Sequence, residues 1–288
     1  MKILIAGKDS YIGTHIRDFL TSYNHQISEL DTLNDSWKTF DYSSFDAIVH
    51  VAAIVHESAK IASEELFKKV NTDLPYNIAV LAKNVGVKNF VFLSTMAVYG
   101  CDKKLPKGNV INEKTELKPT TLYGKSKLEA EKMLSTLADD SFKVAFVRPP
   151  NVYGRDCPGN YMNIFKKIAL KLPVFPYAYN DDRQSMLYID NLSNLVRLII
   201  ENSAGGIFHP QDDFIPSTND LVKAISSALN KKSRTSKFLG FFVKIFSFLG
   251  VVKKLYGGVS YEHTLSDSFD NVYRIVSFKE GINRTFCD

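Results

Sequence analysis

Three side chains in the middle of the chain have the types and spacing needed for proton transfer. Tyr123 and Lys127 are four residues apart, which places them on one face of a helix. A nearby ammonium favours the phenolate form of a tyrosine, so we expect Lys127 to lower the pKa of Tyr123. Upstream, Thr95 could hydrogen-bond a substrate alcohol or carbonyl while Tyr123 exchanges its proton.

The tyrosine–lysine spacing carries little weight without its surroundings. With 14 tyrosines and 28 lysines in 288 residues, chance placement gives about 1.4 such pairs. The chain has two, and the second, Tyr99 with Lys103, falls in a loop rich in glycine and proline. Tyr123 is favoured because residues 90–93 form an apolar run typical of a buried strand, with two hydroxyl residues directly after it. Parallel α/β sheets place their chemistry outside the carboxyl ends of the strands.

The N-terminus has the pattern of a strand, a glycine turn and a helix. Residues 2–6 are expected to form a buried strand, and Gly7, Ser10 and Gly13 follow with the spacing Gly-x-x-Ser-x-x-Gly, ahead of a helix to about residue 20. Such a turn lets main-chain N–H groups approach a pyrophosphate at the positive end of the helix. Ser10 stands where a third glycine is usual, so an ordinary strand-to-helix turn without a ligand is the alternative.

Asp31 follows a second expected strand, residues 26–30. An acid at this place commonly binds the ribose hydroxyls of a dinucleotide and disfavours a 2′-phosphate, which favours NAD over NADP. Lys8 and Lys38 could still bind a phosphate, and Asp31 could equally be a turn residue.

Strands and helices alternate through the first half of the chain. The further expected elements are strands at 45–53, 90–93 and 142–147 and helices at 64–85 and 122–137. The strand at 45–53 ends in the small residues Ala52 and Ala53, as needed where the backbone passes close to a cofactor. This alternation predicts an α/β protein with a doubly wound parallel sheet, and the short segment 31–46 predicts a trimmed crossover.

The pattern is looser after residue 155. We divide the chain into a dinucleotide-binding domain, residues 1–155, and a small mixed α/β substrate lobe, residues 156–288, partly interleaved with it. Helices are expected at 160–170, at 190–201 and from a cap at Ser217 or Thr218 to about residue 230. The Phe-rich segment 238–252 fits an interfacial membrane helix with flanking lysines or a core helix of the lobe, and we favour the core helix.

Composition narrows the classes of protein. The net charge of +5 is spread along the chain apart from basic residues near 231–237 and 253–254, which favours a solvated surface over nucleic-acid binding. Three unclustered cysteines favour a reducing cytoplasm and neither a disulfide framework nor a zinc site. His50 and His56 each stand alone, which favours core or surface roles over metal binding. No signal peptide is expected, and no apolar stretch reaches the roughly 18 residues of a membrane-spanning helix.

Together these segments resemble the extended short-chain dehydrogenase/reductases, the NAD-dependent epimerase/dehydratase family that acts on nucleotide sugars. The resemblance covers nearly the whole chain and implies a Rossmann sheet with NAD(H) or NADP(H) as cofactor. It is carried by Gly7 to Gly13, Asp46 to Ala53, Asn71, Ser94-Thr95 before Val98-Tyr99-Gly100, Pro119, Tyr123 to Lys127, Arg148 to Gly154 and Tyr188 to Leu192.

The resemblance also implies roles for single residues. Tyr123 would be the acid/base, Lys127 would lower its pKa and hold the nicotinamide ribose, and Thr95 would bind the oxygen on the reacting sugar carbon. Asn151 and Arg183 would face the diphosphate of the nucleotide sugar. The implied cofactor contacts are Gly7, Ser10, Tyr11, Ile12, Gly13, Asp31, Ala52, Ala53, Asn71, Ser94, Lys127 and Pro149.

Three features depart from the family pattern. Ser10 replaces a glycine, and the short segment 31–46 puts the ribose contact of Asp31 in question. Arg183 lies one residue further from Tyr188 than in well-known epimerases, so Gln184 could occupy its place.

A narrower resemblance is to a bacterial capsule-synthesis branch, carried by residues 94–100, 157–160, 172–173 and 209–212. It implies reduction at C4 of a UDP-linked 4-keto-6-deoxy-N-acetylhexosamine, with Tyr123 giving the proton. A UDP-glucose or UDP-N-acetylglucosamine 4-epimerase would use the same residues and stays open as the alternative. A 4,6-dehydratase is disfavoured because Met96-Ala97, and not an acidic pair, follows Thr95.

A second alternative comes from another class of protein. A non-catalytic Rossmann protein that senses redox state or binds a partner would need no acid/base, and the intact Thr95, Tyr123 and Lys127 argue against it. Family members are often dimers, so the resemblance is compatible with a homodimer.

Overall fold

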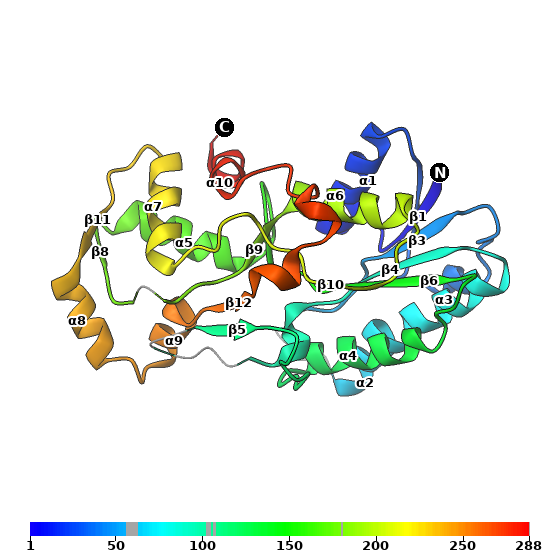
Figure 1. Ribbon diagram of the computed structural model, residues 1–288, viewed down its shortest axis with the longest axis horizontal. Coiled ribbons are helices and arrows are strands. Elements are labelled where there is room, and N and C mark those ends of the chain that lie inside the picture. The colour runs from blue at the N-terminus through cyan, green and yellow to red at the C-terminus, as the bar shows by residue number, and fades with distance from the viewer. Residues whose placement is uncertain (56–62, 102–104, 106–107, 180, 288) are drawn as a thin grey trace.

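The computed structural model describes residues 1–55, 63–101, 105, 108–179 and 181–287. The molecule is elongated, with a large sheet at one end and small strand pairs toward the other (Figure 1). His56, and Lys103 of the second tyrosine–lysine pair, lie outside the described residues.

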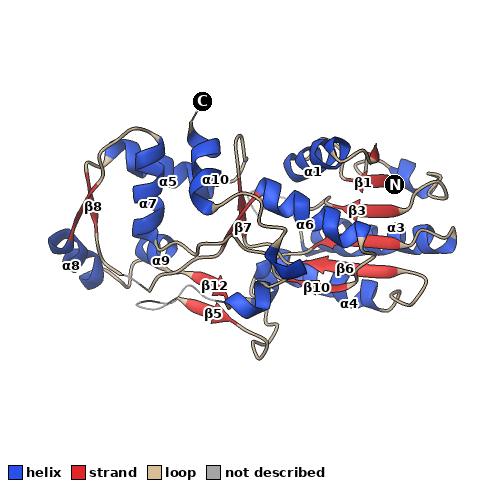
Figure 2. Cartoon of the chain, turned by 45° about the horizontal axis from the view of Figure 1, so that its top comes forward, coloured by secondary structure: helices blue, strands red, loops and turns tan. Residues whose placement is uncertain are grey.

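Six parallel strands form the large sheet in the order β2-β1-β3-β4-β6-β10 (Figure 2). The strands are β1 Lys2–Ala6, β2 Gln26–Leu30, β3 Ala47–His50, β4 Asn89–Leu93, β6 Lys143–Val147 and β10 Gly206–Phe208. The predicted doubly wound parallel sheet is therefore confirmed. Its winding reverses at β1, which has β2 on one side and β3 on the other, so a crevice opens where β1 and β3 end.

Helices cover both faces of this sheet (Figure 1). On one face α1 Tyr11–Ser22 and α6 Ile189–Glu201 pack on Ile3, Ile5, Val49 and Val91. On the other face α3 Leu74–Asn84 and α4 Leu122–Ser135 pack on Leu4, Ile48, Phe90 and Phe92. Successive strand residues point to opposite faces, so a strand covered on both sides must be apolar throughout. Burying each of these side chains contributes about 1.5–3 kcal/mol.

The helix expected over 64–85 is interrupted. It consists of α2 Glu64–Lys68, a π-helical turn Lys69–Asp73 and α3. Single π turns inside helices often mark functional positions, and this one contains Asn71. The trimmed crossover between β2 and β3 is confirmed, with only a short 3₁₀ turn, Asp35–Lys38, between them.

The second part of the chain adds three short parallel strand pairs and the remaining helices. β5 Asn109–Ile111 pairs with β12 Val259–Tyr261, β8 Val174–Pro176 with β11 Arg234–Ser236, and β7 Asn151–Tyr153 with β9 Met186–Tyr188. The helices are α5 Asn160–Lys171, α7 Thr218–Ala228, α8 Lys237–Ile245, α9 Gly250–Tyr256 and α10 Phe278–Phe286. Since β10 and α6 complete the large sheet and β5 pairs with β12, the two halves of the chain interleave in both directions.

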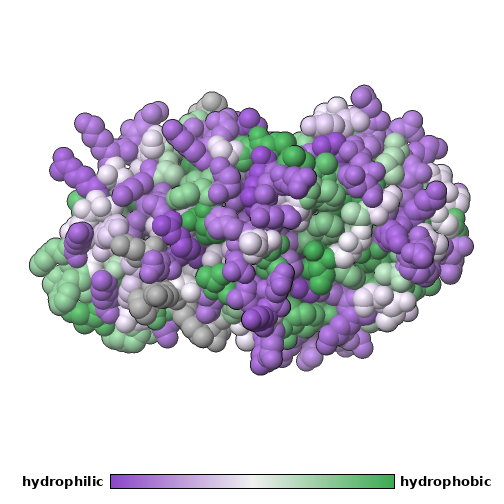
Figure 3. Space-filling view, in the orientation of Figure 1, coloured by the Kyte–Doolittle hydropathy of each residue, from purple (hydrophilic) through white to green (hydrophobic). Residues whose placement is uncertain are grey.

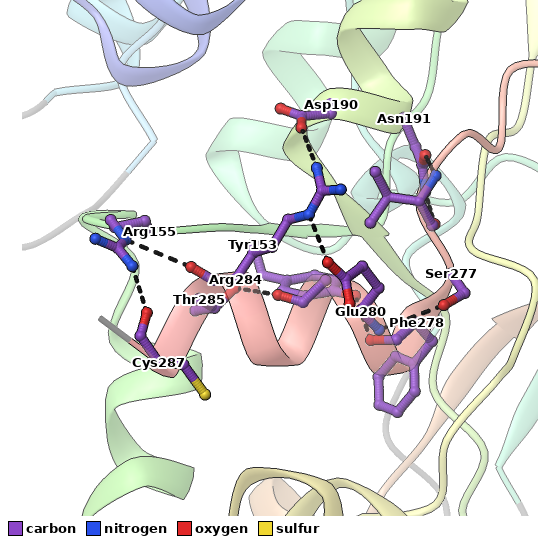
Figure 4. Close-up of polar contacts among 12 residues, drawn as sticks. Tyr153, Arg155, Asp190, Asn191, Ser277, Phe278, Glu280, Arg284, Thr285 and Cys287 are labelled. Atoms are coloured by element: carbon purple, nitrogen blue, oxygen red, sulfur yellow. Dashed lines mark hydrogen bonds and ion pairs between the residues drawn. The ribbon is translucent and has the colours of Figure 1, made fainter. Parts of the chain in front are cut away.

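The C-terminal helix α10 is held against β7 and α6 by polar contacts (Figure 4). Arg284 lies between Glu280, 2.9 Å from its Nε, and Asp190, 3.5 Å from its Nη1. The hydroxyl of Tyr153, in β7, lies 3.4 Å from the main-chain oxygen of Phe278 in α10, and it also donates to the Oδ2 of buried Asp212 at 2.8 Å. These contacts join the last helix to the strand that carries Asn151.

The segment 238–252 is not the core helix that we expected. It contains α8, a turn and the start of α9, and most of its large apolar side chains are exposed. The reason is the position of Gly240, where a Cβ would lie 2.0 Å from the main-chain oxygen of Tyr177. The helix therefore turns its smallest residue toward the protein and its phenylalanines outward. Within the described part of the chain, no helix is long and apolar enough to cross a membrane.

Candidate active site

The glycine turn lies at the crevice between β1 and β3. Gly7 has φ +127°, and a Cβ on it would lie 2.8 Å from the main-chain nitrogen of Ala52, so only glycine fits. Ser10 caps α1: its Oγ accepts from Gly13 N at 3.1 Å and donates to Gly7 O at 2.8 Å. The serine that replaces the usual glycine therefore holds the turn closed, and the N-terminus of α1 remains available for a pyrophosphate.

A cleft of about 770 Å³ adjoins this turn. Of the expected cofactor contacts, the structure brings together Gly7, Ser10, Asp31, Ala52 and Ala53 in its lining. The others, Tyr11, Ile12, Gly13, Asn71, Ser94, Lys127 and Pro149, are not part of that lining. The Tyr11 hydroxyl instead lies against Gly154, where a Cβ would be 2.5 Å from it, and burial raises its pKa.

Asp31 is a turn residue that also lines the cleft. Its carboxylate accepts from Leu33 N at 2.9 Å and from Asn34 Nδ2 at 2.8 Å. Lys8 and Lys38 line the same cleft.

Thr95 and Tyr123 meet at the end of β4. Thr95 begins a 3₁₀ turn and accepts from Ala97 N at 3.1 Å. Tyr123 lies in the first turn of α4, whose N-terminus is capped by Thr121. Burial raises the pKa of Tyr123 to about 12, and the nearby Thr95 hydroxyl acts in the opposite direction. At neutral pH Tyr123 is therefore protonated and able to donate.

Lys127 lies one helical turn after Tyr123, but its effect differs from our expectation. Its Nζ donates to Leu93 O at 2.7 Å and lies 4.4 Å from the centre of the Phe92 ring. Burial lowers the pKa of Lys127 to about 7, and Glu131 partly offsets this. The predicted lowering of the Tyr123 pKa is thus wrong for this structure, because the desolvation of the phenol dominates.

His50 is a core residue beside this lysine. It is fully buried at the end of β3, with its ring about parallel to those of Phe90 and Phe92. Burial, followed by the charge of Lys127, lowers the pKa of His50 to about 3, so its ring is neutral.

Below Ser94 lies a buried polar network to which the sequence analysis gave no role. The Ser94 hydroxyl donates to Glu131, whose carboxylate accepts from Arg148 Nε at 3.0 Å and Nη2 at 2.6 Å. Arg148 Nη1 donates to the Tyr99 hydroxyl at 2.8 Å, and that oxygen is 2.7 Å from His209 Nε2. Burial, followed by the charge of Arg148, lowers the pKa of His209 to about 4. His209 is therefore neutral and accepts the Tyr99 proton.

The sequence contained a signal for one member of this buried polar network, Glu131. Glu131 follows Lys127 by four residues, so Tyr123, Lys127 and Glu131 share one face of α4. The partner of Glu131 lies in the next strand segment and could not be identified from spacing. Tyr99, which we discounted as a chance match, belongs to this polar network.

Asn71 connects the segment after Ala53 to α4. It is fully buried, its Oδ1 accepts from Ile54 N at 2.8 Å and its Nδ2 donates to Ile54 O at 3.0 Å and to Ser126 Oγ at 3.0 Å. Asn71 therefore fixes the backbone after Ala53 relative to α4, rather than lining the cleft itself.

The two expected substrate contacts, Asn151 and Arg183, are placed by different segments. Asn151 is at the start of β7, opposite Met186 of β9. Arg183 lines a separate cavity of about 380 Å³ and pairs with Asp220 at 2.9 Å. The alternative Gln184 accepts a hydrogen bond from the Tyr161 hydroxyl at 2.8 Å.

This fold, with its glycine turn at the switch point and hydroxyl and lysine side chains on β4 and α4, defines a dinucleotide-binding α/β protein. A model of the NAD dependent epimerase/dehydratase family matches residues 3–209, and the chain belongs to this family. Its members are NAD(P)-dependent enzymes that act on nucleotide sugars.

Individual relatives agree with this assignment. The chain is 28% identical to the UDP-glucose 4-epimerase of Vibrio cholerae over 251 residues, 80% of this chain and 76% of that protein. It is 26% identical to the N-acetyl-alpha-D-glucosaminyl-diphospho-ditrans,octacis-undecaprenol 4-epimerase of Escherichia coli O157:H7, over 80% of this chain and 73% of that protein. The fold matches the NAD complex of the UDP-glucose 4-epimerase from Thermus thermophilus with a TM-score of 0.70, 21% identity and coverage of 99% and 98%.

Proposed function

We propose that this protein is a UDP-sugar oxidoreductase working at sugar C4, with Tyr123 as its acid/base. The observation that carries the proposal is the proximity of Thr95 and Tyr123 at the end of β4, with Lys127 buried one helical turn further along α4 and its Nζ 2.7 Å from Leu93 O. A non-catalytic Rossmann protein would not require a protonated phenol next to a threonine hydroxyl at the edge of the sheet where parallel α/β proteins bind their ligands.

The residues around the crevice fit a nicotinamide dinucleotide. Gly7 leaves room for a pyrophosphate at the N-terminus of α1, and Asp31 lines the same cleft with a carboxylate that could bind a ribose. Ala52 and Ala53 are small enough for close approach of the dinucleotide. When bound, the nicotinamide ring supplies the hydride acceptor and donor.

The side chains of this protein handle the proton and the orientation. Thr95 holds the oxygen on C4 by a hydrogen bond while Tyr123 exchanges the proton of that oxygen. Because burial raises the pKa of Tyr123 to about 12, its phenol keeps its proton at neutral pH, which is the state needed to donate to a 4-keto sugar. Oxidation of a C4 alcohol needs the phenolate, so in that direction the bound substrate complex must lower the Tyr123 pKa.

Two forms of this chemistry differ in the fate of the hydride. A 4-epimerase oxidises C4 and returns the hydride to the opposite face, and both relatives described above support this form. A 4-reductase of a UDP-linked 4-keto-6-deoxy-N-acetylhexosamine only delivers the hydride, and the narrower sequence resemblance to the capsule-synthesis branch supports it. We place the epimerase first and keep the reductase as the second candidate.

One assay separates these forms. The protein is incubated with UDP-glucose or UDP-N-acetylglucosamine and no added nicotinamide, and the sugars are separated by chromatography. A 4-epimerase gives the galacto epimers at equilibrium. A second incubation contains the UDP-linked 4-keto sugar and NADH or NADPH. There a 4-reductase oxidises one nicotinamide for each 4-keto sugar reduced. If the UDP-sugars are not epimerised and the 4-keto sugar is not reduced, the proposal is contradicted. A polyprenyl-diphosphate sugar, the substrate class in the name of the second relative, is then assayed.

The proposal includes a cellular location and an oligomeric state. A cytoplasmic location agrees with the unclustered cysteines and the nucleotide-sugar substrate, and a homodimer agrees with the family resemblance. Cell fractionation and light scattering of the purified protein test these two points.

A further inference from the structure

The surface of α8, the following turn and the start of α9 is unlike the rest of the molecule. It is made of exposed apolar side chains at one tip of the substrate lobe, and Figure 3 shows it as a hydrophobic edge where Figure 1 places α8. Phe238, Phe241 and Phe248 are 71%, 60% and 69% exposed. We define the α8–α9 surface as Phe238, Leu239, Phe241, Phe242, Ile245, Phe246, Phe248, Leu249 and Val251.

This exposure is a property of the fold. Gly240 faces the protein so closely that a Cβ on it would be 2.0 Å from Tyr177 O. The phenylalanines of α8 therefore cannot rotate inward without moving the helix away from β8. Apolar patches of this kind on soluble proteins mark places where another surface is bound.

The charge next to this surface is cationic. Lys237, Lys244 and Lys253 are exposed beside its apolar side chains. From residue 221 to residue 261 the sequence has eight lysines and arginines and no acid. The whole chain has a net charge of only +5, so the rest of the chain is net negative. Positive charge is thus concentrated around this apolar tip.

We propose that the α8–α9 surface binds the interface of an anionic lipid bilayer. Helices that lie in the membrane plane combine a face of Phe and Leu with flanking lysines, whose long side chains reach the phosphates while the apolar face enters the acyl region. Binding through the α8–α9 surface would anchor the substrate lobe and keep the dinucleotide crevice, on the large sheet, away from the membrane.

A second copy of this chain fits the surface less well. A two-fold symmetric dimer places the same patch on both sides of the interface, so its lysines would face lysines with no acid to pair them. An anionic bilayer supplies the complementary charge. The inference rests on this surface alone and does not depend on which reaction the protein catalyses.

Vesicle flotation of the full chain tests the proposal. Vesicles of equal parts phosphatidylcholine and phosphatidylglycerol are compared with pure phosphatidylcholine vesicles. We expect the protein to float with the anionic vesicles and to partition far less onto the neutral ones. Each lysine near an anionic surface strengthens binding about fivefold, so neutralising three lysines should weaken binding about a hundredfold. The charge variant is Lys237→Gln with Lys244→Gln and Lys253→Gln.

An apolar variant and a matched control complete the test. Replacing Phe238, Phe241 and Phe248 by Ser should abolish flotation while dinucleotide binding and circular dichroism stay unchanged, because these side chains do not pack in the core. The control neutralises exposed lysines elsewhere, Lys114→Gln with Lys132→Gln and Lys279→Gln, and should float like the wild type.

Three results would overturn the inference. The wild type could remain with the unbound protein at both vesicle compositions, or the control could lose as much binding as the charge variant. The phenylalanine variant could also change the oligomeric state measured by light scattering while vesicles bind neither protein, which would assign the α8–α9 surface to a contact between copies.

Discussion

The ammonium group of Lys127 donates a 2.7 Å hydrogen bond to the main-chain oxygen of Leu93, inside the protein. This bond ties the face of α4 that carries Tyr123 to the last residue of β4, directly before the hydroxyl residues Ser94 and Thr95. The helix that carries Tyr123 and the strand end are thereby held in register. The cost is a buried cation, which shows in the low pKa of Lys127.

The low pKa of Lys127 predicts a pH-dependent stability. Its folded pKa of about 7 is below the ordinary 10.5, so between these values the unfolded chain binds a proton that the folded protein does not. Raising the pH through this window therefore stabilises the folded wild type, by at most about 1.4 kcal/mol per pH unit. Lys127→Met should remove this rise. Urea unfolding across the window measures it.

The control for this prediction is Lys125→Met, at an exposed position of the same helix. It should keep the wild-type rise. Parallel stability–pH profiles for the wild type and Lys127→Met would show that Lys127 keeps its proton in the folded protein.

Tyr123→Phe should lower turnover about 10²–10⁴-fold, because it removes the proton donor but leaves the shape of the site. Dinucleotide binding, measured by fluorescence titration, should change less than about threefold, since no part of the cleft lining is altered. Tyr23→Phe, at an exposed position, is the control. Undiminished turnover in Tyr123→Phe would favour a protein without acid/base chemistry at this residue.

Breaking the buried pair of Glu131 and Arg148 should lower the free energy of unfolding strongly, whereas replacing both residues by apolar ones should lower it little. Glu131→Gln leaves a buried guanidinium without its counter-charge, and we expect the free energy of unfolding to fall by about 3–5 kcal/mol. Glu131→Leu combined with Arg148→Met should recover much of this stability. Glu280→Gln, in an exposed pair with Arg284, should cost less than about 1 kcal/mol. Chemical denaturation of the four proteins gives the comparison, and a double variant less stable than Glu131→Gln contradicts it.

Asp31 should make the protein prefer NADH to NADPH. It lines the cleft, where its carboxylate would repel the 2′-phosphate of a bound NADPH. Asp31→Asn should narrow the ratio of the two dissociation constants about fivefold or more, equivalent to about 1 kcal/mol. Calorimetric titration with both dinucleotides measures the ratio. Asp35→Asn, which lines the same cleft but pairs with Lys38, is the control. An equal change in both variants would assign the effect to overall charge.

Local sequence signals determined much of this protein. The strands expected at 2–6 and 26–30 have the predicted ends, and of the two predicted cap residues, Ser217 and Thr218, it is Ser217 that caps α7. The four-residue spacing placed Tyr123 and Lys127 on α4, and Gly7 was identified because a turn between strand and helix needs it. Each of these features depends on residues within a few positions of one another.

Other features were decided only when distant segments met. The partner of Lys127 is in β4 and that of Glu131 is Arg148, directly after β6, so neither the low pKa of Lys127 nor the buried polar network could be derived from α4 alone. The outward face of α8 depends on the contact of Gly240 with Tyr177, more than sixty residues earlier in the sequence. An apolar helix has the same sequence pattern whether its wide face is buried or exposed, because burial is fixed by what packs against it and not by the helix itself.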